Sequence, residues 1–145
     1  IIVTHILAAG MSITDRVVRL ERGRLVPDAQ RTIFDGTVIE ADGHAVFQIV
    51  NGPAVRVVTV KRGAARGIVA PTDVILSAES FPSSMQNMFQ GTVTRVTGAE
   101  GLVQVTVDIG RPVRAHVTPE ACQTLGLVPG RPVWVMFKAT AVEVY

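Results

Sequence analysis

Short stretches of alternating apolar and polar residues, separated by glycine-containing turns, make up most of the chain. Alternation with a period of two is typical of strands that bury one face. The pattern predicts hairpins with turns near residues 42–44 and 98–101, and closing strands at 133–135 and 141–144. Thirteen glycines, eight prolines and many valines also favour short strands over long helices, so the predicted class is all-β.

An internal repeat organises this pattern. The sequence FDGTV at residues 34–38 returns as FQGTV at residues 89–93, and each copy is followed by a strand pattern, a turn and a second strand pattern. We therefore expect two small barrels or half-barrels, at residues 31–79 and 80–145.

One short helix is predicted within the second copy. Thr118 is a good capping residue, Pro119 suits the first helical position, and Gly126 can end the helix. The first 30 residues differ in character, because an apolar run at 1–3 precedes a ribbon predicted to turn at Arg22-Gly23.

Composition and charge exclude several classes of function. Of the 145 residues, 48% are hydrophobic, and the net charge of +2 comes from interspersed basic and acidic residues, so we expect no nucleic-acid partner. Cys122 is the only cysteine in the sequence, so no internal disulfide can form. No apolar run reaches the roughly 18 residues of a membrane span. We expect a soluble, cytoplasmic domain, and the start at Ile1 indicates processing, a boundary or a missing beginning.

A polar segment precedes the strand predicted to begin at Met88. Its side chains are short hydroxyls and amides, which bond to nearby backbone groups in turns. The segment is either an ordinary polar loop or a set of hydrogen-bond donors for a small ligand. Its polar residues are Ser83, Ser84, Gln86 and Asn87.

The N-terminal stretch resembles the end of an ABC transporter ATPase domain. Val3-Thr4-His5 is similar to the strand that carries the switch histidine, and residues 15–26 are similar to the closing segment of that domain. Phosphoryl transfer requires a glycine-rich phosphate loop with its lysine, and the sequence contains no such motif. We therefore expect no enzymatic activity from this chain, which we interpret as part of a larger ATPase subunit.

The rest of the chain resembles the TOBE or Mop family of oxyanion-binding modules. The resemblance implies two OB-like β-barrel lobes and the C-terminal regulatory region of a molybdate/tungstate importer's ATPase subunit. It rests on five segments in family order, at residues 71–77, 83–91, 117–120, 125–130 and 137–142.

The same resemblance implies a molybdate or tungstate site between two copies of the chain, with no cofactor. Tetrahedral dianions need donors from several directions. The partners implied are a second copy and, through an ATPase domain, membrane subunits at the inner face of the cell membrane. The implied ligands are Ser84, Gln86, Asn87, Thr118, Lys138, Ala139 and Thr140; many family members carry Arg at the position of Gln86.

Other interpretations remain open. Ser84 and Asn87 could simply cap a turn, Thr118 could cap a helix, and Lys138 could be a solvated strand-edge residue. The module could be a structural dimerisation unit with a vestigial pocket, or could bind a sugar or a single-stranded nucleic acid. A metal centre is not expected, because His5, His44, His116 and Cys122 lack ligand spacing.

Overall fold

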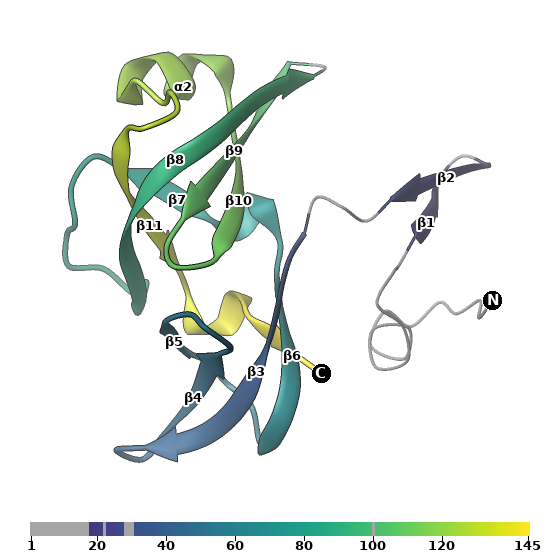
Figure 1. The fold of residues 1–145 in the computed structure, drawn as a ribbon, viewed down its shortest axis with the longest axis vertical. Coiled ribbons are helices and arrows are strands. Elements are labelled where there is room, and N and C mark those ends of the chain that lie inside the picture. Colours follow the sequence, from purple (N-terminus) through teal and green to yellow (C-terminus); the bar gives the residue numbers. More distant parts are fainter. Residues whose placement is uncertain (1–17, 22, 28–30, 100) are drawn as a thin grey trace.

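The computed structural model describes residues 18–21, 23–27, 31–99 and 101–145. Within them the chain is nearly all β, with two five-stranded antiparallel sheets, a two-stranded ribbon and one α-helix (Figure 1). The ribbon pairs β1 (Val18–Glu21) with β2 (Arg24–Pro27), as predicted. The apolar run at 1–3 and His5 lie outside the described residues.

The two sheets have the same order of equivalent strands when the second is read in reverse, as β7-β11-β8-β9-β10. The first sheet runs β12-β6-β3-β4-β5, comprising β3 (Thr32–Ala41), β4 (His44–Ile49), β5 (Ala54–Arg56), β6 (Gly63–Val69) and β12 (Glu143–Val144). The second runs β10-β9-β8-β11-β7, comprising β7 (Ile75–Ser77), β8 (Asn87–Ala99), β9 (Leu102–Asp108), β10 (Pro112–Val117) and β11 (Pro132–Phe137).

Each copy of the repeat gives its last strand to the other sheet. Strand β7 follows the first copy in sequence but pairs with β11, with Ile75 opposite Met136. Strand β12 ends the second copy but pairs with β6, with Glu143 opposite Ile68. A boundary between residues 79 and 80 therefore does not separate the sheets, which are interlocked by this exchange.

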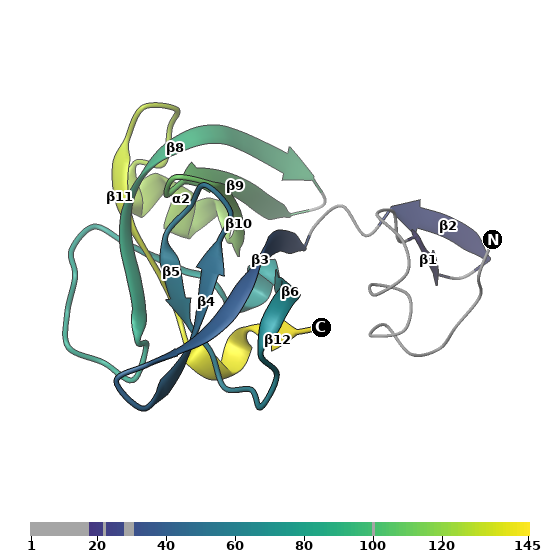
Figure 2. The same cartoon turned by 60° about the horizontal axis from the view of Figure 1, so that its bottom comes forward.

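The predicted turns and helix are present. The β3–β4 hairpin turns at Asp42 and Gly43, both at positive φ, as expected for an Asp-Gly hairpin turn. Helix α2 (Pro119–Leu125) begins after Thr118 and ends at Gly126 in the left-handed conformation. Figure 2 shows β8 curving along its length, with α2 beneath it.

One predicted strand is shorter than expected. Of residues 141–144, only Glu143–Val144 form a strand, because Ala139–Ala141 form a 3-10 turn, η2. An equivalent turn, η1 (Pro71–Asp73), precedes β7. Both turns lie where the two sheets meet (Figure 1).

The glycine of each repeat motif is explained by close backbone contact. A Cβ on Gly36 would lie 2.3 Å from the carbonyl oxygen of Gln48, and one on Gly91 would lie 2.6 Å from that of Asp108. The neighbouring strand therefore passes too near for any side chain at these two positions.

A single hydrophobic core spans both sheets. Phe47 of the first sheet and Phe137 of the second are fully buried and belong to the same cluster. Burial of this cluster is the main force holding the interlocked sheets together. No helix among the described residues is long and apolar enough to cross a membrane.

Candidate functional site

The polar segment before β8 forms a local turn with exposed side chains. The Ser83 hydroxyl accepts a hydrogen bond from the backbone N–H of Met85 at 3.2 Å. Ser84 and Gln86 are exposed. The turn is built by its own serine, as such residues commonly do, and leaves two polar side chains facing solvent.

The Asn87 side chain is buried and bonds to the backbone of another strand. It is 2% exposed; its Oδ1 accepts from the Arg56 N–H at 2.8 Å, and its Nδ2 donates to the Arg56 carbonyl at 3.0 Å. These two bonds join the start of β8 to the end of β5. This clamp fixes the position of Gln86, the preceding residue.

The segment of residues 138–140, called the Lys138 segment, lies beside this clamp between Asn87 and Arg56. Phe137, the last residue of β11, is opposite Asn87 in the sheet register, so the chain leaves β11 next to the Gln86 turn. Lys138 and Thr140 are exposed, and Ala139 is buried. The Lys138 carbonyl accepts from the Ala141 N–H at 3.0 Å, which closes η2. Six of the seven predicted residues, all except Thr118, therefore gather at one end of the β8–β11 pair.

Thr118 is not part of this gathering. It follows β10, whose Val117 is opposite Val103 of β9, and Val103 is opposite Gly98 near the far end of β8. The Thr118 hydroxyl accepts from the Ala121 N–H at 3.1 Å and caps α2. Its O–H remains a possible donor, but one chain does not bring it to the Lys138 segment.

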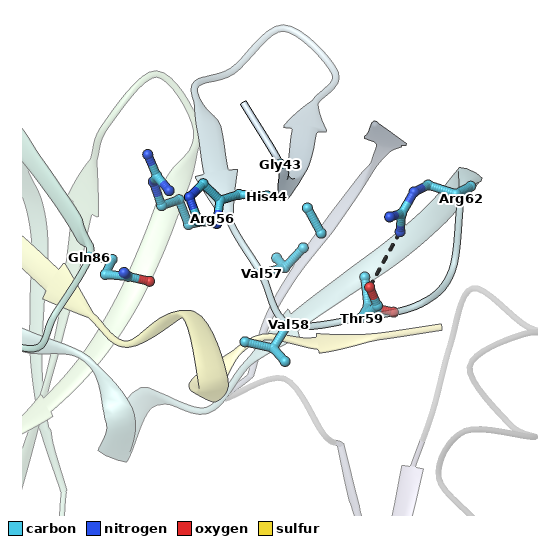
Figure 3. A pocket seen from close by; sticks show the side chains of 9 residues that line it. Gly43, His44, Arg56, Val57, Val58, Thr59, Arg62 and Gln86 are labelled. Carbon is cyan, nitrogen blue, oxygen red and sulfur yellow. Dashed lines mark hydrogen bonds between the residues drawn. The ribbon is translucent and has the colours of Figure 1, made fainter. Parts of the chain in front are cut away.

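A groove of about 310 Å³ adjoins the Gln86 turn. Figure 3 shows Gln86 on one side of it, with Arg56 and His44 near by and Arg62 with Thr59 farther along. Sequence analysis missed Arg56, which is far from the polar segment in the chain. The available signal was the sequence Val-Arg at 55–56, which recurs as Val-Arg at 113–114 in the second copy.

No cluster of three His, Cys, Asp or Glu residues suitable for a metal ion occurs within the described residues. His116 lies 3.3 Å from Gln104 through its Nε2, and burial lowers its pKa below 6.5. The Cys122 thiol contacts the carbonyl of Leu127 at 3.6 Å. The groove beside Gln86, in contrast, offers hydrogen-bond donors and the cations Arg56 and Arg62, which suit an anion.

These residues fall within a recognised domain. Residues 83–144 match the family described as the TOBE domain, and this match includes all seven predicted ligand residues. Over residues 83–144, the chain is therefore similar to the TOBE domain family.

The relatives that match nearly the whole chain are import ATP-binding proteins. The molybdate/tungstate import ATP-binding protein WtpC of Pyrococcus abyssi is 32% identical over 99% of this chain and 46% of its own length. The molybdenum import ATP-binding protein ModC 1 of Azotobacter vinelandii is 29% identical over 90% of this chain and 39% of its own. The chain thus spans about half the length or less of the curated relatives it matches.

A solved structure has the same fold. The cytoplasmic molybdate-binding protein ModG, in a form with molybdate bound, superposes with a TM-score of 0.69 and 23% identity. The superposition covers 78% of this chain and 94% of ModG.

Proposed function

We propose that this chain binds molybdate or tungstate between two copies of itself, as the regulatory part of an importer's ATP-binding subunit. The proposal is supported by the relatives, which import these anions, and by the fold, which occurs in a molybdate-binding protein. The observation that carries it is that the exposed Gln86 turn leads into β8 at the same end of the β8–β11 pair at which the chain leaves β11 for the exposed Lys138 and Thr140.

The donors suit a tetrahedral dianion. Residues with hydroxyl, amide and ammonium groups flank the start of β8 and the end of β11, and an ammonium gives a charge-assisted hydrogen bond. Lys138 is one of only two lysines in the chain. In this proposal Ser84, Gln86, Lys138 and Thr140 donate to the anion, Ala139 shapes the turn, and Asn87 holds the Gln86 turn in place.

The separate position of Thr118 supports a pocket completed by a second copy. A twofold dimer brings the same surface of each chain together and creates two equivalent sites. In such a dimer the Thr118 hydroxyl of one copy can approach the Lys138 segment of the other. We expect light scattering to give the mass of a dimer at high protein concentration; a monomer with and without tungstate would contradict this arrangement.

Regulation follows from preferential binding to the clamped dimer. A site filled at 100 times its dissociation constant stabilises the binding-competent state by about 2.7 kcal/mol. When cytoplasmic oxyanion is plentiful, the clamped tails would hold the attached ATPase domains apart and lower uptake. The chain itself carries no phosphate-binding loop, so it contributes regulation and not ATP hydrolysis.

Thermal unfolding with added tungstate tests this function. We expect millimolar tungstate to raise the melting temperature of the parent and the Lys61→Ala variant equally, and to raise that of Lys138→Ala much less. Lys61 is the matched control because it is the only other lysine and is exposed in the β5–β6 loop. No shift in the parent, or an undiminished shift in Lys138→Ala, would favour a structural dimerisation module instead.

A further inference from the structure

The groove beside Gln86 is lined by nitrogen donors from the first sheet. His44 comes from the start of β4, Arg56 from the end of β5, and Arg62 from the loop before β6. Figure 3 shows the Arg56 guanidinium and the Gln86 amide on the same side of the groove. No carboxylate is among the residues that line it. The groove therefore has the chemistry of an anion site.

The two guanidiniums of the groove differ in their partners. Arg62 forms an ion pair with Glu40 at 3.1 Å and donates to the backbone carbonyls of Thr59 and Lys61. The Arg56 side chain is exposed and has no ion pair or hydrogen bond with the described part of the chain. Arg56 is therefore the guanidinium in this groove that is available to a ligand.

The position of Arg56 is fixed by the Asn87 clamp. Both hydrogen bonds of the clamp use the backbone of Arg56 and leave its side chain untouched. The clamp holds Arg56 next to the residue that follows Gln86, although the two lie far apart in sequence. The clamp thus fixes the backbone that carries the exposed Arg56 side chain beside the Gln86 turn.

The equivalent arginine of the other copy is used differently. The backbone N–H of Arg114 donates to the buried Thr32 hydroxyl at 2.9 Å, as that of Arg56 donates to Asn87. However, the Arg114 guanidinium turns inward and donates to the Arg31 carbonyl at 3.3 Å. The same backbone position thus carries an internally bonded guanidinium in one copy and an available one in the other.

We propose that Arg56 is a further oxyanion-binding residue, which supplies a guanidinium from the first sheet to an anion held by the Gln86 turn. This inference rests on the proposed function. A guanidinium presents two parallel N–H groups that match two oxygens of a tetrahedral oxyanion, and Gln86 adds a neutral donor. The anion is then held in the groove by Arg56 from β5 and by Gln86 from the turn before β8.

Calorimetric titration with tungstate tests the assignment. The variants are Arg56→Gln, Arg56→Lys, Lys138→Ala and the control Arg95→Gln, which removes an exposed arginine of β8 outside the groove. We expect Arg56→Gln to weaken binding about tenfold, Arg56→Lys to weaken it less, and Arg95→Gln to leave it unchanged. Unchanged melting temperatures without ligand will show that the Asn87 clamp persists.

The outcomes separate this inference from the proposed function. Tungstate binding that is lost in Lys138→Ala but unchanged in Arg56→Gln would overturn the role of Arg56 alone. Equal losses in Arg56→Gln and Arg95→Gln would reduce it to a net-charge effect and also overturn it. A parent chain that binds no tungstate would overturn both proposals. Weakening by Arg56→Gln with undiminished binding by Lys138→Ala would retain Arg56 as an oxyanion-binding residue and overturn the ligand role of Lys138.

Discussion

The two places where the sheets are clamped together have the same framework and different chemistry. At one clamp the buried Asn87 amide bonds to the backbone of Arg56; at the other the buried Thr32 hydroxyl bonds to the backbone of Arg114. Each clamp joins the first residue of a long strand to an outer strand of the opposite sheet. The repeat thus builds one junction twice.

The surroundings of the Thr32 clamp are closed by internal bonds. Arg31 lies 3.9 Å from Glu143, whose carboxylate also accepts a hydrogen bond from the Tyr145 hydroxyl at 2.5 Å. Burial, together with this bond and the Glu143 charge, raises the pKa of Tyr145 to about 12. The adjoining turn η1 begins after Ala70, whereas η2 begins after Lys138. The comparison shows one junction whose side chains are bonded to one another and one with donors left exposed.

The largest expected loss of stability comes from the glycines of the repeat motif, which both copies share. Gly36→Ala forces a methyl group against the Gln48 carbonyl and the Phe47 ring, so we expect a loss of about 3 kcal/mol in the free energy of unfolding. Gly91→Ala should cost a comparable amount. Gly98→Ala is the control, because a Cβ there meets nothing within 4 Å. Urea denaturation measures all three, and a harmless Gly36→Ala would contradict the close approach.

The second-largest loss of stability is expected from substitutions in the two clamps. Asn87→Ala removes two hydrogen bonds and leaves the Arg56 N–H and carbonyl without partners, which should cost about 2–3 kcal/mol. Thr32→Val keeps the shape but removes one bond to Arg114, and should cost about 1–2 kcal/mol. Denaturation of both variants should remain a single transition, because the sheets share one core. Equal costs would contradict the difference between the clamps.

Two equivalent threonines test whether the two junctions differ in tungstate binding. Thr140 in η2 and Thr72 in η1 are equivalent and exposed. We expect Thr140→Ala to weaken tungstate binding about fivefold, because it removes one neutral donor. Thr72→Ala should leave the dissociation constant unchanged in the same calorimetric titration. Weakening by both variants would mean that the two junctions do not differ in binding.

The smallest expected effect is a pH dependence of stability. It comes from His116, which lies in β10, the strand that also carries Arg114. Burial lowers the pKa of His116 below 6.5, so the unfolded chain binds a proton more readily than the folded one as the pH falls through 6.5. The free energy of unfolding should therefore decrease in that range. Urea denaturation at successive pH values should show a weaker decrease for His116→Gln, and an identical pH dependence would contradict the prediction.

Local pattern determined much of this structure. Alternating residues, the Asp42-Gly43 turn and the cap at Thr118 specify hairpins and a helix through interactions within a few residues, and all of these are present. The repeated glycine motif marked equivalent strands, although the reason for glycine appeared only with the neighbouring carbonyl in place. Ser84, Gln86 and Lys138 were named from a resemblance, and their roles stay predictions.

Only the tertiary structure decided how the two copies combine and which donors remain available. The exchange of β7 and β12 cannot be read from alternation, because a short strand pairs equally well with either sheet until the core closes. Nor does the sequence distinguish Asn87 as a buried clamp from Asn87 as an exposed donor, or place Arg56 beside Gln86. These outcomes depend on contacts between residues far apart in the chain, whereas turns and strands depend on neighbours within it.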